Sequence, residues 1–225
     1  MIAIIYDLEM TVTRRKGQIS EIIEIGAVKL THSEGKAVIL DTFQTFVKPT
    51  LTSRITEDTT SFTGISQQDI ILADELPAAL ERFVAWIGIE EYALCSWGRD
   101  DKIQFTKECR LKKIPLRWLK NYTDVQQQIS SLMGRPNKQQ IGLKTALEEL
   151  NLPFVGSHHR ALDDAYNTAL LYINFADKIS LHQNRTTDHA AYESEIYYKD
   201  PSNDDEDSLA NNPFAALQRL KNDTE

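Results

Sequence analysis

Residues 1–11 read MIAIIYDLEMT, an apolar run that ends in two carboxylates with one residue between them. An unbroken apolar run such as residues 2–6 is typical of a strand that is buried in a sheet. Alternate residues of a strand face the same side, so Asp7 and Glu9 share a face, with Cα atoms about 6.5–7 Å apart. Two buried carboxylates would repel each other and lose hydration.

Two interpretations of this acidic pair are open from the pair alone. Asp7 and Glu9 can be solvated surface charges just past the end of the strand. They can also be ligands of a divalent cation, which would balance their charge. The hard ions Mg²⁺ and Mn²⁺ prefer such oxygen ligands.

Outward from this strand (residues 2–9), the chain predicts an α/β domain over residues 1–180. Strands are expected at residues 22–30 and 36–47, with short polar connections, so the first three strands form an antiparallel meander. Further along, helices alternate with short strands. The helices are expected at 76–87, 100–112, 124–133, 142–150 and 160–179, a short helix after Ser66, and the strands at 92–97 and 116–122.

Charge is unevenly distributed along the 225 residues, whose formal net charge is −8. Residues 102–144 contain ten basic and two acidic residues. Such a local excess can follow a phosphate backbone, or it can be the solvated face of helices. The basic residues are Lys102, Lys107, Arg110, Lys112, Lys113, Arg117, Lys120, Arg135, Lys138 and Lys144.

Residues 181–225 are expected to form an acidic, largely disordered tail, because hydrophobic periodicity fades there and ten acidic residues face four basic ones. The end of this tail, LANNPFAALQRLK (209–221), spaces Phe214, Leu217 and Leu220 as an amphipathic helix would. This segment is a candidate docking motif for a protein partner. A frayed helix without a partner is the alternative.

The sequence predicts a cytoplasmic protein with no membrane partner. No apolar stretch approaches the roughly 18 residues that a membrane-spanning helix needs. The N-terminus lacks the basic region and the cleavage site of a signal peptide. Cys95 and Cys109 fit no zinc or thioredoxin spacing, so both are expected to be reduced thiols.

Further acids stand where two helices are expected to begin. The expected strand 92–97 runs into Gly98-Arg99-Asp100-Asp101, and ligand sites of α/β domains lie beyond the carboxyl ends of strands. The last helix opens with HHRALDDA (158–165), which places a histidine before the helix and an acid one turn inside it. If this helix packs beside the first strand, its acid completes a metal site. The histidine is then a candidate general base, because imidazole is the side chain whose unperturbed pKa is closest to neutral.

These motifs, in this order, resemble the DEDD-type 3′–5′ exonucleases of the ribonuclease H-like superfamily, in the subgroup with a histidine in the third motif. YDLEMT resembles the first motif and HRALDDA the third. SWGRDD resembles the second, in the W-G-x-x-D form of the histone-mRNA 3′-exonuclease-like (KapD-like) branch. SEIIEIGAVKL and SFTGIS match as well, so the resemblance covers about residues 1–177. It implies a mixed sheet of about five strands flanked by helices.

The metal ligands that the resemblance implies are Asp7, Glu9, Asp101 and Asp164. They would hold two Mg²⁺ or Mn²⁺ ions, with His159 as the general base. Neighbouring residues leave a choice of register, because Asp100 precedes Asp101 and the pair His158 and Asp163 has the same spacing as His159 and Asp164. The W-G-x-x-D spacing favours Asp101, and HRALDDA favours His159 with Asp164.

The resemblance also implies contacts to the terminal nucleotide. Met10 and Thr11 hold the positions just after the first motif. Phe62 and Ile65 of SFTGIS are candidates to wedge against the last base, and Trp97 is a weaker one, because bases stack on aromatic rings regardless of sequence. Ordinary core packing is the alternative for Phe62 and Trp97.

The function that the resemblance implies is metal-dependent 3′–5′ hydrolysis of single-stranded ends to nucleoside 5′-monophosphates. The W-G form of the second motif favours RNA as the substrate. A DNA exonuclease that trims or proofreads 3′ ends shares the motifs and is the first alternative. The second is a domain that binds nucleic acid or protein without catalysis, although all five catalytic positions hold competent residue types.

Overall fold

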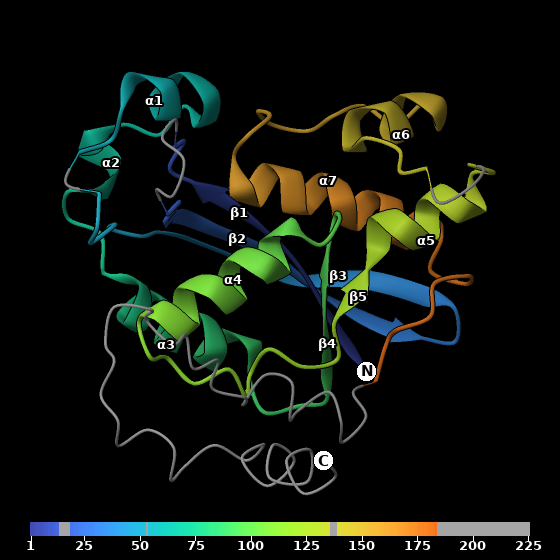
Figure 1. The fold of residues 1–225 in the computed structure, drawn as a ribbon. Coiled ribbons are helices and arrows are strands. Elements are labelled where there is room, and N and C mark those ends of the chain that lie inside the picture. The colour runs from blue at the N-terminus through green and yellow to red at the C-terminus, as the bar shows by residue number, and fades with distance from the viewer. Residues whose placement is uncertain (14–18, 53, 136–138, 184–225) are drawn as a thin grey trace, which may run out of the picture. The chain divides into compact units, whose positions relative to one another are not determined.

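The computed structural model describes residues 1–13, 19–52, 54–135 and 139–183. Its centre is a five-stranded sheet in the order β3-β2-β1-β4-β5 (Figure 1). The strands are β1 (Ile2–Met10), β2 (Ile22–Ser33), β3 (Lys36–Phe46), β4 (Tyr92–Ser96) and β5 (Thr123–Asp124). β1, β2 and β3 pair antiparallel, whereas β4 runs parallel to β1 and β5 parallel to β4. The predicted mixed sheet, with an antiparallel meander as its first three strands, is confirmed.

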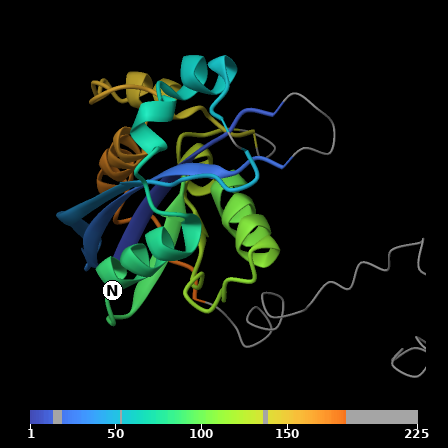
Figure 2. The ribbon, with the colours of Figure 1, turned by 90° about the vertical axis from the view of Figure 1, so that its left-hand side faces the viewer.

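Helices cover both faces of this sheet, with α7 on one side and α4 on the other (Figures 1 and 2). The helices are α1 (Glu57–Thr63), α2 (Gln67–Ile70), α3 (Leu76–Ile87), α4 (Asp100–Leu111), α5 (Val125–Leu132), α6 (Leu143–Glu149) and α7 (Ala161–Asn174). α3 and α4 contribute to one core cluster, and α5, α6 and α7 to a second one. The sheet is therefore buried on both sides at β1.

β1 divides its side chains between these two cores. Ile4 and Tyr6 pack with α3 and α4, and Ala3 and Ile5 pack with α5, α6 and α7. A strand that is covered on both faces has no polar side, which explains why its sequence is continuously apolar rather than alternating. By the same alternation, Asp7 and Glu9 lie on the face that α7 covers.

α7 packs against the meander at Gly26 of β2. A Cβ atom at this position would lie 2.1 Å from the Leu162 backbone nitrogen and 2.2 Å from the Ala161 carbonyl carbon. Only glycine permits so close an approach of helix and strand. Because Gly26 pairs with Asp7 across the two strands, this contact brings the first turn of α7 next to the end of β1.

The prediction of a strand at residues 116–122 is wrong. Leu119 donates a backbone hydrogen bond to Leu116, and Asn121 has a left-handed φ of 53°, so this segment turns instead of extending. Leu116 and Leu119 are spaced to point together into the core with α3 and α4. The strand itself is only Thr123–Asp124.

Other elements also differ from the predictions, most of them by one to three residues at an end. The last helix ends at Asn174 rather than at residue 179. Residues 57–63, where no helix was predicted, form α1, which ends at Gly64 with a left-handed φ of 71°. Ser66 does begin the next helix, α2, as predicted, and its N–H and hydroxyl both donate to Asp69.

Cys95 and Cys109 are buried free thiols, as predicted. Among the described residues, no helix combines the length and the apolar character that a membrane crossing requires. The predicted tail lies almost wholly outside the described residues, which end at Gln183, as does its segment 209–221. The tail and the boundary at residue 180 therefore stay predictions.

Candidate active site

The two acids of β1 lie against the neighbouring strand β2. Asp7 is opposite Gly26 and Glu9 is opposite Glu24, and the register shifts immediately after Glu9. Glu9 is only 5% exposed. Burial, followed by the charge of Asp164, raises the pKa of the Glu9 carboxyl to about 8. Burial also raises the pKa of Asp7, and the charges of Asp101 and Asp164 add to this effect.

Asp101 is held in the first turn of α4 and is 7% exposed. The turn between β4 and α4 needs Gly98, whose φ is 95°, a value that other residues rarely adopt. Burial raises the pKa of Asp101 to about 7, although a hydrogen bond from the Leu8 backbone N–H opposes the shift. Asp101 therefore contacts β1 between its two acids, whereas Asp100 beside it is exposed.

Asp164 and His159 are tied together at the start of α7. The backbone N–H of His159 donates to Oδ2 of Asp164 at 2.8 Å, and His159 adopts a left-handed φ of 60°. Asp163 points elsewhere, because its carboxylate accepts a 2.8 Å hydrogen bond from the Ser157 N–H in the preceding loop. The different partners of Asp163 and Asp164 support the predicted register.

These side chains converge from β1, α4 and the start of α7. Glu9, His159 and Asp164 each offer a ligand atom, and the three atoms lie within 4.8 Å of one another. Asp7 and Asp101 belong to the same cluster, since charges of this cluster raise the pKa of each. Because these acids raise one another's pKa values, the negative charge of the ionised cluster is not balanced by nearby cationic side chains. The donor set thus fits hard divalent cations.

A fifth acid, Glu24, was not singled out from the sequence. Its buried carboxylate accepts hydrogen bonds from the Ala161 N–H at 3.1 Å and from the Arg160 guanidinium at 3.0 and 3.3 Å, and from Gln44 at 2.6 Å. Glu24 therefore anchors the first residues of α7 beside the site, and its charge is balanced by the Arg160 side chain. In the sequence, the signal that could have identified Glu24 is an acidic residue within the otherwise apolar run of residues 22–28.

Phe62 reaches the site from α1. Its side chain is 55% exposed, and its ring centroid lies 4.1 Å from that of His159. Ile65, in contrast, is 1% exposed and packs with Ile23 and Ile70 in a separate small core cluster. The prediction that Ile65 wedges against a base is therefore corrected, since its side chain is covered by the strand and helix that it holds together.

The other three residues that were predicted to contact substrate, Met10, Thr11 and Trp97, are half-buried or buried. The Thr11 side chain is 3% exposed and accepts a 2.9 Å hydrogen bond from the Glu21 N–H, so it fastens the end of β1 to β2. Met10 is half-buried at the end of β1. Trp97 is half-buried against the core that contains α7, and its Nε1 has no partner among the described residues. The roles of Met10, Thr11 and Trp97 stay predictions.

Part of the basic stretch 102–144 is occupied within the protein. Lys112 lies 3.2 Å from Glu21 and 3.3 Å from Glu108, both of which are buried. Lys102 lies over the Tyr122 ring, and Lys120 lies over another tyrosine ring. Contact with a phosphate backbone therefore stays a prediction for the exposed members of the stretch.

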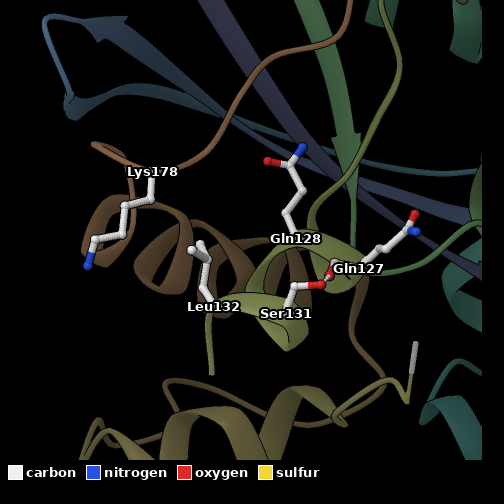
Figure 3. A pocket seen from close by; sticks show the side chains of 5 residues that line it. All are labelled: Gln127, Gln128, Ser131, Leu132 and Lys178. Atoms are coloured by element: carbon white, nitrogen blue, oxygen red, sulfur yellow. Dashed lines mark hydrogen bonds between the residues drawn. The ribbon is translucent and has the colours of Figure 1, made fainter. Parts of the chain in front are cut away.

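A surface hollow of about 320 Å³ is formed by α5 and the segment that follows α7 (Figure 3). Its lining residues are Gln127, Gln128, Ser131, Leu132 and Lys178. Gln128 is held by two hydrogen bonds of 2.9 Å to the Ser180 backbone. No candidate site residue lines this hollow, so it does not compete with the acidic cluster as the active site.

The acidic cluster predicts a pH-dependent response of thermal stability to divalent ions. The pKa of Glu9 rises from 4.5 to about 8 on folding, so the folded protein keeps a proton that the unfolded chain has released. Metal-free stability therefore falls as pH rises across this interval. Mn²⁺ at about 100 times its Kd should raise Tm by about 5–10 °C at pH 8. The gain should shrink at pH 6, where protons compete. Equal gains at both pH values, measured calorimetrically, would contradict this.

Comparison with known proteins gives a consistent result. A family model described as "Exonuclease" (RNase_T) matches residues 4–172. The 3'-5' exoribonuclease 1 of Rattus norvegicus is 30% identical over 162 residues, which are 68% of this chain and 46% of that protein. The PolC-type DNA polymerase III of Thermotoga maritima is 29% identical over 171 residues, 76% of this chain and 12% of that protein. The chain thus spans about half the length of the exoribonuclease that it matches.

Solved structures share this fold. The nuclease domain of 3'hExo, described as a DEDDh family member bound to rAMP, has a TM-score of 0.72 and 27% identity, over 82% of this chain and 96% of that domain. A 3'-exonuclease that recognises the 3' end of the histone mRNA stem-loop has a TM-score of 0.69 and 26% identity, over 77% and 80% of the two chains. The predicted ribonuclease H-like fold is confirmed.

Proposed function

The chain belongs to the exonuclease family, and on that premise we propose that it is a metal-dependent 3′–5′ exonuclease for single-stranded nucleic acid, preferably RNA. Its products would be nucleoside 5′-monophosphates. The observation that carries the proposal is a cluster of four acids and one histidine inside the matched residues: the ligand atoms of Glu9, His159 and Asp164 lie within 4.8 Å of one another, and charges of the cluster raise the pKa values of Asp7 and Asp101. The four acids are Asp7, Glu9, Asp101 and Asp164.

These four acids would hold two Mg²⁺ or Mn²⁺ ions. Burial raises the pKa values of all four acids, and repulsion within the cluster adds to this for Asp7, Glu9 and Asp101, so protons compete with cations for these carboxylates. Bound ions of this kind polarise a phosphate and make water a better nucleophile. Without them, the acids would repel the phosphate of a nucleic acid, so binding of the 3′ end should depend on divalent ions.

His159 would accept the proton of the attacking water. Its imidazole is exposed, while its backbone is fixed by the hydrogen bond to Asp164 and its ring rests on Phe62. These contacts hold the imidazole beside Glu9 and Asp164 without burying it. A base needs such a fixed position within reach of the proton that it removes.

Phe62 would stack on the terminal base, and Phe62→Ala should therefore lower kcat/KM. Loss of one base–aromatic stack costs about 1–3 kcal/mol, which corresponds to about a 5- to 150-fold decrease. Phe62→Tyr keeps the ring and should stay within about threefold of the wild type. Steady-state rates on a labelled oligonucleotide measure both variants. Equal losses in Phe62→Tyr and Phe62→Ala would rule out stacking as the reason.

The preference for RNA rests on the exoribonuclease relatives and the nuclease domain that binds rAMP. The similarity to a PolC-type DNA polymerase favours DNA as the second candidate substrate. Matched RNA and DNA oligonucleotides of one sequence, each labelled at the 5′ end, separate the two in the presence of Mn²⁺. Faster shortening of DNA would overturn the RNA preference, and no shortening of either would overturn the exonuclease proposal.

A further inference from the structure

We propose that Glu108 of α4 is a positioning residue of the active site, which bonds α4 to the start of β2 and thereby holds Asp101 against the end of β1. Glu108 and Asp101 lie on the same buried face of α4, about two helical turns apart. The effect of Glu108 on hydrolysis rests on the proposed exonuclease function. Its effect on the position of Asp101 does not, and can be measured separately.

The buried face of α4 combines polar and apolar side chains. Asp101, Gln104 and Glu108 are buried there, and Phe105 and Cys109 beside them pack into the core with α3. Apolar contacts are non-directional, so they do not by themselves specify the exact position of a helix along a sheet. Hydrogen bonds require a defined distance and angle. The partners of the buried polar side chains therefore determine where α4 lies.

Gln104 and Glu108 both bond to the main chain at the start of β2. Oε2 of Glu108 accepts a 2.8 Å hydrogen bond from the Ile22 N–H, and Nε2 of Gln104 donates to the Ser20 carbonyl at 2.7 Å. Gln104 also donates to Oε2 of Glu108 at 3.1 Å, and Lys112 lies 3.3 Å from the other carboxylate oxygen. A buried carboxylate is stable only where it keeps such partners, so these contacts hold α4 in one position.

A change of strand register gives Glu108 its partner on β2. Glu9 pairs with Glu24, whereas Met10 pairs with Ile22, so β2 has one extra residue at this point. Such a bulge interrupts the ladder of main-chain hydrogen bonds and leaves a main-chain group for another partner. The bulge lies directly after Glu9 on β1, so Glu108 bonds to the main chain beside the end of the acidic cluster.

The start of β2 is in turn bonded to the end of β1. Thr11 donates its N–H to the Glu21 carbonyl, and its hydroxyl accepts the Glu21 N–H, both at 2.9 Å. Residues 20–22 therefore connect α4 to β1. Asp101 also contacts β1 directly, because its carboxylate accepts a hydrogen bond from the Leu8 N–H. α4 is thus attached to β1 directly at its first turn and indirectly about two turns later.

Loss of the acceptor at Glu108 should release the indirect attachment. The Ile22 N–H would then be buried without a partner, and α4 should shift until this group finds water or another acceptor. Asp101 would move with the helix, and a displacement of about 1 Å can lower a rate about a hundred-fold. Glu108 lies about 10 Å along α4 from Asp101, so it would act through Asp101 and not on the substrate.

Three variants of the full chain separate the hydrogen bond from the charge. Glu108→Leu removes the acceptor, and Glu108→Gln keeps an acceptor oxygen without the charge. Lys112→Met keeps the acceptor but leaves two buried acids, Glu21 and Glu108, without their cation. Lys112→Met is therefore the matched control for general destabilisation, and urea unfolding should show that it is less stable than the wild type.

Turnover of a 5′-labelled oligonucleotide with Mn²⁺ is the first readout. We expect kcat of Glu108→Leu to fall about 30- to 100-fold, because Asp101 is displaced from the reacting phosphate. KM should change less than about threefold, because the proposed base contact at Phe62 lies on α1, away from α4. Glu108→Gln and Lys112→Met should keep kcat within about fivefold of the wild type, since both retain the acceptor for the Ile22 N–H.

Backbone hydrogen exchange, measured by NMR without metal or substrate, is the second readout. It reports whether the Leu8 N–H is still bonded to Asp101. We expect exchange at Leu8 to be at least about tenfold faster in Glu108→Leu than in the wild type. Exchange at Ile5, which pairs with strands on both sides, should be unchanged. Glu108→Gln and Lys112→Met should exchange at Leu8 as the wild type does.

The outcomes distinguish this inference from the proposed function. An unchanged kcat or an unchanged exchange rate at Leu8 in Glu108→Leu would overturn the positioning role, as would an equal loss of kcat in Glu108→Gln or Lys112→Met. If the wild type hydrolyses no substrate, the exonuclease proposal fails, and exchange at Leu8 alone decides the role of Glu108. If Glu108→Leu does not fold, Glu108→Asp replaces it. Its carboxylate is one methylene short of the Ile22 N–H, so kcat should fall at least about tenfold.

Discussion

Asp7→Asn is expected to reduce shortening of a 3′ end by about a thousand-fold or more while the protein stays folded. Asp7 faces the centre of the acidic cluster, and its negative charge would help hold the divalent ions. Metal ions contribute several kcal/mol to transition-state stabilisation, and about 4 kcal/mol corresponds to a thousand-fold in rate. Turnover of a 5′-labelled oligonucleotide with Mn²⁺ measures the loss.

Although Asp7→Asn should lower activity, it should not lower the thermal stability of the metal-free protein. Burial and the charges of Asp101 and Asp164 raise the pKa of Asp7, so the metal-free fold is destabilised when this carboxyl is ionised. Asparagine has nearly the same shape and no charge. The variant should therefore have an equal or higher Tm than the wild type at pH 8 without metal, a combination that misfolding cannot produce.

Asp100→Asn is the matched control for this variant. Asp100 is exposed and adjoins Asp101. Its charge favours the N-terminus of α4 by about 0.3–1 kcal/mol and helps to raise the pKa of Asp101, but its side chain is not one of the proposed ligands. Activity should remain within about twofold. A thousand-fold loss in Asp100→Asn would show that the second motif is assigned in the wrong register, and full activity in Asp7→Asn would refute the active site.

The first strand and its acids could be predicted from sequence because the signals are local. A continuous apolar run specifies a strand that is buried on both faces, and alternation then places Asp7 with Glu9. The convergence with Asp101 and Asp164 depends on where α4 and α7 pack. The resemblance to a family supplied that step, because spacing along one chain does not specify which helix lies beside which strand.

Other features depend on contacts that the local sequence does not encode. A strand of two residues, Thr123–Asp124, is too short to show a period, and the nearby leucines were misread as its members. Ile65 follows an exposed aromatic residue by three positions, yet Ile23 of a distant strand buries it. Burial of this kind is a property of tertiary packing and overrides the local pattern.

The pairing of Glu24 is another contact that the local sequence does not encode. Its partners Arg160 and Ala161 lie more than 130 positions along the chain, so the sequence around Glu24 contains no sign of its pairing. In the fold, this buried acid pulls the start of α7 toward β2. The neighbouring acids repel Asp164 at the same place. The position of α7 therefore results from an attraction at Glu24 and close packing at Gly26 that together overcome the repulsion.

Gly26→Ala is expected to lower activity about a hundred-fold and to destabilise the protein by about 1–3 kcal/mol. The new Cβ would lie 2.1 Å from the Leu162 backbone, so α7 must move outward by more than 1 Å. Asp164 and His159 move with it, and a displacement of 1 Å can cost a hundred-fold. Gly142→Ala is the control, since its Cβ meets only Thr145 at 3.9 Å. Urea unfolding and turnover measure both variants. Normal turnover in Gly26→Ala would mean that α7 does not set the geometry of the site.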